Sequence, residues 1–195
     1  MINAIAKKIA DDYGQNKADA VKEQAEIRLK TIREENSDDP KVMKSHTDRI
    51  YPGIAVYEAM RSFAIEEDQA VDYIRQYFYD ICDKVVPVLR AAFKVPGVYK
   101  KVPELFIKIA RDSFSEEAGF VYEWPELPED TYGFDIVKCP YFNICTKYGC
   151  PEIVPAFCDS DDRSYGNMHD NLIWERTETI GRGCDRCNYR IRVKK

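Results

Sequence analysis

Residues 132–137 read YGFDIV, and this mixture of aromatic and β-branched residues is typical of a half-buried β-strand. A similar stretch, FVYEW, lies just before it at residues 120–124. Two later segments, residues 172–180 and 187–193, alternate in polarity on either side of Gly181-Arg182-Gly183 and predict a hairpin. These segments predict a small, mainly antiparallel sheet in the C-terminal part of the chain.

The chain before residue 115 has helical patterning instead. Apolar side chains recur every three or four positions over residues 2–35, with a break predicted at Gly14. Asp39 and Pro40 are typical of a capped helix start, and a further helix is predicted to open at Pro52. Further helices are predicted at residues 66–93, kinked at Pro87, at 103–114 and, shorter, at 139–149.

We therefore expect an α+β fold in which a helical N-terminal part packs on a small, mainly antiparallel C-terminal sheet. The expected organisation is one domain, residues 1–195, with a mainly helical part at residues 1–114 and a cysteine-rich sheet part at residues 115–195.

The composition restricts the partners of the chain. Its 195 residues are 45% hydrophobic, 12% aromatic and 32% charged, which is typical of a folded protein rather than a disordered one. A net charge of −5 argues against a nucleic-acid partner, because such proteins carry a basic surface. No apolar run approaches the ~20 residues that span a bilayer, and residues 1–14 lack the apolar core of a secretory signal. We expect a cytoplasmic protein with no membrane partner, and self-association into a homo-oligomer stays open.

Six of the seven cysteines lie between Cys139 and Cys187, and Cys82 stands alone. In a reducing compartment they would be thiols, metal ligands or reactive groups rather than disulfides. Cys184 and Cys187 form the one C-x2-C pair, whereas a zinc site often needs two such pairs, so we expect no bound metal. The alternative to a reactive role is that most of these residues are small buried hydrophobes.

Arg176 shares a strand face with Leu172 and Trp174, so its side chain is expected to face the core. A buried guanidinium requires a negative partner, either an internal Asp or Glu or the carboxylate of a substrate. On the last strand alternate residues from Cys187 to Val193 are expected to face the core, and the residues between them, Arg190 included, to face solvent.

The sequence contains no Gly-rich phosphate loop, HExxH motif or Rossmann fingerprint. The two histidines have no local signature of a Ser-His-Asp or Cys-His arrangement. His46 is the better candidate of the two, because it precedes the predicted helix entry at Ile50-Tyr51-Pro52.

Several short blocks of sequence resemble the L-2-amino-thiazoline-4-carboxylic acid hydrolase family over residues 46–193. The blocks are HTDRIYPGIAVY at residues 46–57, FDIVKCPY at 134–141, FCDSD at 157–161, LIWERTETIGRG at 172–183 and CNYR at 187–190. The chain differs from the family pattern at Asn188, where Asp is usual, and in the additional residues Cys145, Cys150 and Cys184. The C-terminal half also resembles, more faintly, the vinyl-reductase-type small-molecule-binding domains.

The first resemblance implies a hydrolase that opens a 2-amino-thiazoline carboxylate to N-carbamoyl-cysteine. Water or a thiolate must add to the amidine-like carbon of the ring, and the ring sulfur must leave. No cofactor is expected. The candidate catalytic residues are Cys139, Cys158 and Asp161, with Asp161 as the base. The candidate substrate-binding residues are Arg176, as the ligand of the substrate carboxylate, Cys187 and His46. The second resemblance implies a non-catalytic ligand-binding or sensory module.

Overall fold

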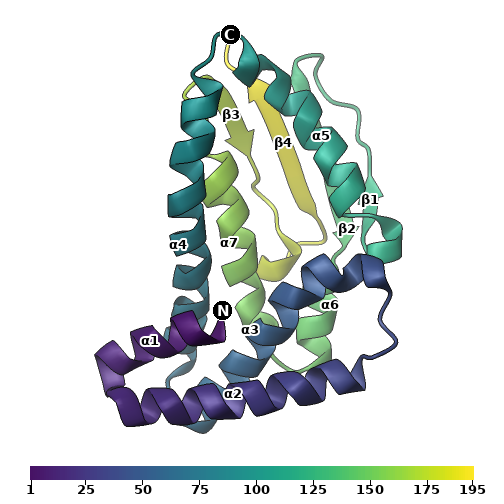
Figure 1. Cartoon of the computed structure of the whole chain (residues 1–195). Helices are drawn as coiled ribbons and strands as arrows, with labels where there is room; N and C mark the ends of the chain where they lie inside the picture. Colours follow the sequence, from purple (N-terminus) through teal and green to yellow (C-terminus); the bar gives the residue numbers. More distant parts are fainter. The chain divides into compact units, whose positions relative to one another are not determined.

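Seven α-helices and four β-strands make up the computed structural model, which describes residues 1–195 (Figure 1). The helices are α1 (Ile2–Tyr13), α2 (Gln15–Glu35), α3 (Lys44–Ser62), α4 (Glu67–Phe93), α5 (Val102–Ser113), α6 (Pro140–Lys147) and α7 (Val154–Tyr165). The strands are β1 (Val121–Glu123), β2 (Thr131–Lys138), β3 (Leu172–Glu175) and β4 (Cys187–Val193). The helical N-terminal elements and the antiparallel C-terminal sheet confirm the α+β fold.

The chain divides into two units, each built from two segments of sequence. Unit 1 contains Met1–Phe78 and Tyr141–Phe157, and unit 2 contains Tyr79–Pro140 and Cys158–Lys195. The expected single domain over residues 1–195 stays a prediction.

In unit 1, helices α1, α2 and α3 pack against one another. The predicted break at Gly14 is confirmed: its φ of +86° lies in the left-handed region, which glycine adopts without strain, and it separates α1 from α2. A close approach occurs at Gly53 of α3, where an added Cβ would lie 2.7 Å from Cζ of Phe157. A larger residue at position 53 would therefore require the Phe157 ring to move.

The predicted start of a helix at Pro52 is wrong, because Pro52 lies inside α3. A proline costs a helix one backbone hydrogen bond, but most of the residues of α3 from Ile50 to Met60 are buried. Their packing keeps the helix continuous. Asp39 does not cap this helix either, and its carboxylate accepts a hydrogen bond from the hydroxyl of Tyr51 instead.

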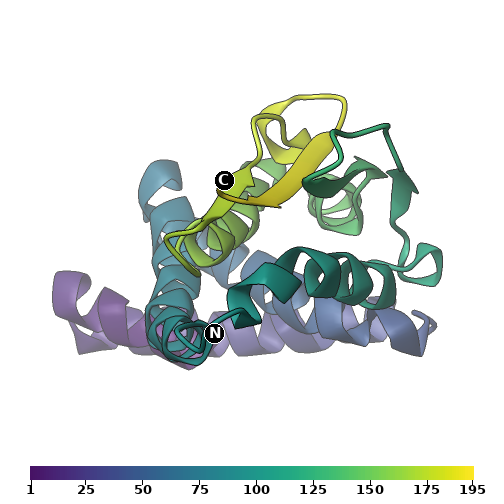
Figure 2. The same cartoon turned by 90° about the horizontal axis from the view of Figure 1, so that it is seen from above.

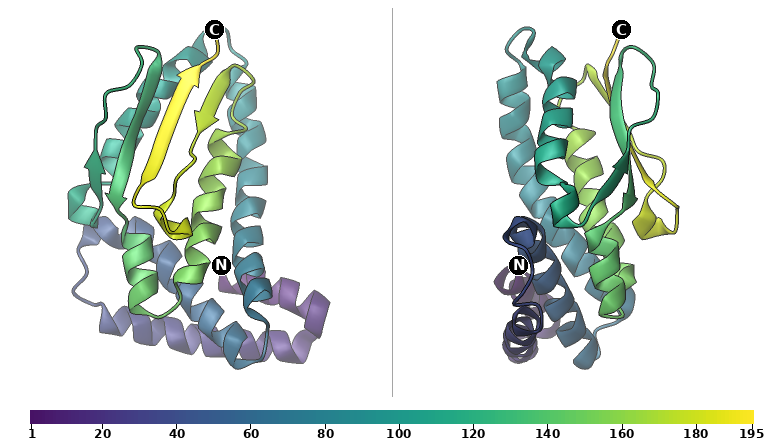
Figure 3. Two further views of the ribbon diagram at one scale, coloured as in Figure 1. Left: turned by 180° about the vertical axis from the view of Figure 1, so that it is seen from behind. Right: turned by 90° about the vertical axis from the view of Figure 1, so that its right-hand side faces the viewer.

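In unit 2 the strand order is β1-β2-β4-β3, and all neighbouring strands are antiparallel. One face of the sheet packs against α5, and Figures 2 and 3 show α5 and α7 on the same side of the sheet. Phe106 of α5 lies at the centre of this core. Its ring centroid is 5.5 Å from those of Phe134 and Trp174 and 6.5 Å from that of Tyr189. The predicted alternation therefore places these strand residues on one buried face.

The predicted strand over residues 172–180 is shorter in the structure and ends at Glu175. The side chain of Asn188 explains this end. Its Oδ1 accepts hydrogen bonds of 2.8 Å from the backbone N–H groups of Thr177 and Glu178, and its Nδ2 donates to Thr177 Oγ1 at 2.8 Å. These contacts replace the backbone ladder and turn the chain toward a short 3-10 helix at Ile180–Arg182.

The prediction that Arg190 faces solvent is wrong, because its side chain is held against the sheet. Its Nη2 donates to Oδ1 of Asp135 at 2.6 Å, and its Nη1 donates to the carbonyl of Phe134 at 2.9 Å. Arg186 donates to the other carboxylate oxygen of Asp135 at 3.0 Å. Because the Asp135 side chain is only 3% exposed, its charge requires these cations, and they hold Arg190 against the sheet.

Candidate active site

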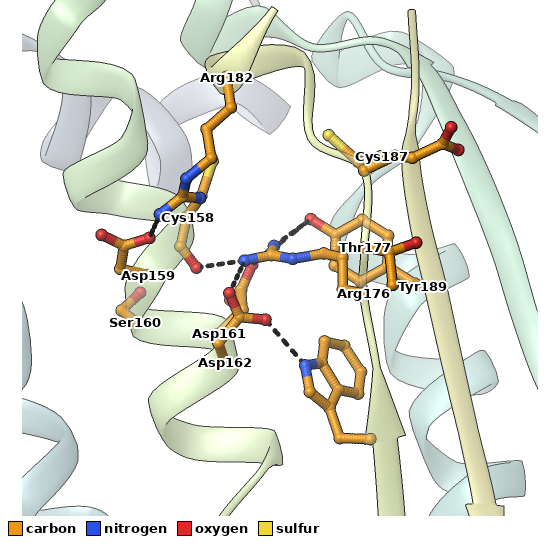
Figure 4. Close-up of polar contacts among 12 residues, drawn as sticks. Cys158, Asp159, Ser160, Asp161, Asp162, Arg176, Thr177, Arg182, Cys187 and Tyr189 are labelled. Atoms are coloured by element: carbon orange, nitrogen blue, oxygen red, sulfur yellow. Dashed lines mark hydrogen bonds and ion pairs between the residues drawn. The ribbon is translucent and has the colours of Figure 1, made fainter. Parts of the chain in front are cut away.

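Three elements of unit 2 bring most of the predicted site residues together (Figure 4). Helix α7 carries Cys158 and Asp161 on successive turns. Arg176 follows the end of β3, and β4 begins with Cys187. Cys139, which directly precedes α6, belongs to the same unit and lies near enough to Cys158 for its charge to affect that thiol.

Arg176 is the centre of the arrangement, and its side chain is fully buried. Its Nη1 donates to Asp161 Oδ2 at 3.1 Å and to the hydroxyl of Tyr189 at 3.2 Å. Its Nη2 donates to Asp162 Oδ2 and to the carbonyl of Cys158, both at 2.7 Å. The predicted burial of Arg176 is confirmed, and the negative partners are internal carboxylates. The Nε of Arg176 is buried without a hydrogen-bond partner.

The two carboxylates that face Arg176 reach solvent. The side chains of Asp161 and Asp162 are 32% and 42% exposed. Burial alone would lower the pKa of Arg176, but the neighbouring negative groups, Asp161 and Asp162 among them, raise it above its ordinary value. The guanidinium is therefore a permanent cation behind two accessible carboxylates. Trp174 fixes one of these, because its Nε1 donates to Asp162 Oδ1 at 2.9 Å.

The thiols beside Arg176 are neutral at physiological pH. Burial raises the pKa of Cys158 well above that of a free thiol, although the charge of Arg176 acts in the opposite direction. Burial also raises the pKa of Cys187, opposed by a hydrogen bond of 3.2 Å from the N–H of Ile180 to its sulfur. A neutral thiol is a weak nucleophile. Cys139 and Cys158 are partly buried, and Cys187 is buried.

The other cysteines of the chain fit a packing role. Cys145 and Cys150 of unit 1 and Cys82 of unit 2 are all buried. The Sγ of Cys82 accepts a hydrogen bond from the hydroxyl of Ser164 at 3.1 Å. For these three residues the structure supports the interpretation as small buried hydrophobes.

His46 lies in unit 1, whereas the other five candidate residues lie in unit 2. The His46 side chain is buried, and its Nδ1 lies 3.2 Å from the hydroxyl of Tyr141. The two rings meet edge to face with centroids 5.6 Å apart. Five of the six candidate residues therefore belong to unit 2, and His46 belongs to unit 1.

The match to a known protein family includes the candidate residues of both units. The model of the L-2-amino-thiazoline-4-carboxylic acid hydrolase family matches residues 43–191 of the 195-residue chain. The chain belongs to this family. No significant match to it was found among curated proteins or solved structures. Separately, none of its helices has the length and apolar character that crossing a membrane requires.

The part of the chain that matches the hydrolase family holds site residues that the sequence analysis missed. Asp162 binds Arg176, and Arg182 forms an ion pair with Asp159, which is largely buried. These acidic residues lie on α7, a helix that was not predicted because residues 154–165 lack a clear apolar period. Pro155 near its start and Arg163 in its last turn are the signals that could have indicated it.

No group of three or more His, Cys, Asp or Glu side chains is arranged to hold a metal ion. Cys184 and Cys187 remain the one closely spaced pair. What the arrangement offers chemically is a fixed, accessible carboxylate, a buried cation and several thiols.

Proposed function

We propose that the chain is a hydrolase that opens a small, carboxylate-bearing heterocycle such as L-2-amino-thiazoline-4-carboxylate to N-carbamoyl-cysteine. The observation that carries the proposal is the match of the hydrolase family to residues 43–191, which include Asp161, Arg176 and the three neighbouring thiols. The proposed substrate is a small molecule, and water is the proposed second reactant.

The proposed reaction exchanges one bond for another at the amidine-like carbon of the ring. The oxygen of water bonds to this carbon and passes a proton to a base, and the carbon–sulfur bond then breaks. The ring nitrogen takes up that proton as its double bond to the carbon becomes single. The ring sulfur leaves with the bonding electron pair while the added hydroxyl becomes the carbonyl, and the hydroxyl proton ends on the sulfur, which gives the free thiol and the carbamoyl group. In the covalent variant a protein thiolate adds first, the ring sulfur leaves, and water then releases the protein thiol.

Asp161 is the proposed base. Its Oδ2 accepts hydrogen bonds from Arg176 at 3.1 Å and from the Tyr189 hydroxyl at 3.4 Å, so the orientation of the carboxylate is fixed. Its side chain is one-third exposed, which lets water or a substrate reach it. A positioned, accessible carboxylate is what general-base catalysis requires.

Arg176 acts in this proposal as a positioning residue for Asp161. Both terminal nitrogens already donate to protein groups, and the side chain is fully buried, so a substrate carboxylate would have to displace Asp161 or Asp162. Direct binding of the substrate carboxylate by Arg176 remains the competing proposal. Arg182 is the more accessible cation: its side chain is half exposed and donates to Asp159, and a guanidinium has further N–H donors for an anion.

The three thiols are proposed to have different roles because they differ in protonation state. Cys139 is the proposed nucleophile of the covalent variant, because burial keeps Cys158 and Cys187 protonated. A protonated Cys158 suits proton donation to the departing sulfur, and Cys187 lines the substrate. His46 stays a proposed substrate-binding residue.

The experiment is a turnover assay without added metal. Purified protein is incubated with L-2-amino-thiazoline-4-carboxylate, and N-carbamoyl-cysteine is quantified by mass spectrometry together with the new thiol. We expect Asp161→Asn and Cys139→Ser to lower the rate at least about a hundredfold, the size of loss typical of acid–base or nucleophile removal. The matched controls are Asp185→Asn, an exposed carboxylate of the same unit, and Cys184→Ser.

Circular dichroism would show that each variant folds. Retained activity in both Asp161→Asn and Cys139→Ser would remove these residues from the site. Saturable binding of the thiazoline by the wild-type protein without any turnover would replace the hydrolase by a ligand-binding or sensory module.

A further inference from the structure

A second feature of unit 2 involves none of the residues of the proposed active site. It comprises the second half of α4, the turn at residues 94–101 and α5. Between residues 84 and 111 the chain has seven Lys and Arg residues and one acidic residue, Glu104, a balance of 7 − 1 = +6 in a chain whose net charge is −5. The basic residues are Lys84, Arg90, Lys94, Lys100, Lys101, Lys108 and Arg111. This local charge is the opposite of the charge of the whole protein.

Large apolar side chains are exposed among these basic residues. They are Val85, Val88, Val95, Val98, Leu105 and Ile109. Val88 is 68% exposed and Val95 is 56% exposed, more than any other large apolar residues of the chain except Ile27, which equals Val95. Single exposed apolar residues are ordinary, but Val95 and Val98 lie in a turn of eight residues that also carries Lys94, Lys100 and Lys101, and this grouping indicates a contact surface.

The outward direction of these side chains is set by packing inside unit 2. Val102, Phe106 and Ala110 of α5 are buried, and Leu105 and Ile109 lie along one edge of this buried face, where they are 48% and 46% exposed. The turn between α4 and α5, visible at the upper end of these helices in Figure 1, is also anchored.

Two contacts anchor it. The ring of Tyr99 stacks on that of His169, with centroids 4.4 Å apart and an angle of 6° between the planes. Arg90 donates to the carbonyl of Asn167 at 2.9 Å and to Asp170 Oδ1 at 2.6 Å. Lys94, Lys100 and Lys101 and the side chains of Val95 and Val98 therefore project from a fixed turn.

We propose that this basic and apolar surface binds reversibly to an anionic lipid bilayer, with Val95 and Val98 entering the interface. Lys94, Lys100 and Lys101 lie beside these valines in the turn and would face the lipid phosphates. Charge complementarity selects the anionic surface, and the interleaved apolar side chains select a bilayer, because nucleic-acid phosphates offer them no apolar environment. The lack of a spanning apolar run concerns crossing of a bilayer, and the local charge over residues 84–111 concerns binding to its surface.

The test measures partition of the full chain onto sedimented vesicles. One set contains phosphatidylcholine alone, and the other contains phosphatidylcholine with about one-third phosphatidylserine. The triple variant Lys94→Glu, Lys100→Glu, Lys101→Glu removes the charge, and the double variant Val95→Ser, Val98→Ser removes the apolar contact. The matched control, Lys7→Glu, Lys41→Glu, Lys44→Glu, makes the same change of net charge at exposed positions of unit 1.

We expect binding to the anionic vesicles only, weakened by salt. Each basic residue near an anionic surface contributes roughly fivefold, so the triple variant should lose at least about a hundredfold in partition while the control changes little. The valine variant should lose part of the binding, and thiazoline hydrolysis should be unchanged in all three.

Three results would overturn the proposal: no binding of the wild-type chain to anionic vesicles, equal binding to neutral vesicles, or equal loss in the control variant. Sedimentation velocity provides a further check. A wild-type dimer that the valine variant dissociates, without vesicle binding, would assign this surface to contacts between copies of the chain. Binding to a polyglutamate peptide but not to vesicles would assign it to an acidic protein segment.

Discussion

Substitution of Arg176 by Lys separates the two roles proposed for this residue. Lys keeps the positive charge but has one nitrogen in place of the planar fork that reaches Asp161, Asp162, Tyr189 and the carbonyl of Cys158. It can retain at most some of these contacts. If Arg176 holds internal groups, the loss is present whether or not a substrate is bound.

The expected magnitude follows from the contacts. Breaking a fully buried ion pair costs about 3–5 kcal/mol, and a net hydrogen bond contributes about 0.5–1.5 kcal/mol. Asp161 and Asp162 are one-third or more exposed and can be rehydrated, which places the cost of Arg176→Lys below that of a buried pair. We expect the free energy of unfolding to fall by about 2–3 kcal/mol. For a chain of this size the melting temperature would then fall by roughly 4–12 °C.

The assay combines thermal unfolding without substrate and steady-state kinetics on the same preparation. The matched control is Arg192→Lys, because Arg192 pairs with Glu175 at 3.2 Å and both side chains are more than one-third exposed. This control should change the free energy of unfolding by less than about 0.5 kcal/mol. As a positioning residue, Arg176 should affect kcat more than KM when it is replaced. An unchanged melting temperature together with a raised KM would refute the internal role and support direct binding of the substrate carboxylate.

Two further predictions concern proton and metal binding. Burial raises the pKa of the Cys158 and Cys187 thiols, so the folded state keeps protons that the unfolded chain releases. Their contribution to stability is complete below the ordinary thiol pKa of about 8.5 and is lost progressively as the pH rises toward the raised pKa of the folded state. The melting temperature should therefore fall between pH 8 and pH 10, less steeply in Cys158→Ala, and an equal slope in both proteins would contradict this. Protein purified without chelator should contain no stoichiometric zinc or iron by elemental analysis, because the chain has one close cysteine pair. One tightly bound metal ion per chain, lost in Cys184→Ser, Cys187→Ser, would show that this prediction is wrong.

Features that depend on neighbours in the sequence were determined by the sequence itself. The break between α1 and α2 follows from Gly14, because its positive φ is a property of one residue. The strands β2 and β4 follow from aromatic and β-branched residues at alternating positions. The same alternation predicted that the Arg176 side chain is buried, since it shares a face with Leu172 and Trp174. It also required that this charge have a negative partner.

The sequence did not show which acidic residues are the partners of Arg176, and only the tertiary structure identified them. Asp161 and Asp162 are two of 34 acidic residues, and the local pattern around them predicts no helix that would bring them to Arg176. Helix α7 is stabilised by the burial of Val154, Ala156 and Phe157, contacts that depend on distant parts of the chain. Packing likewise keeps α3 continuous through Pro52. Ion pairing and burial act through space between residues far apart in sequence, so the residues that surround the thiols became identifiable only when the elements were packed together.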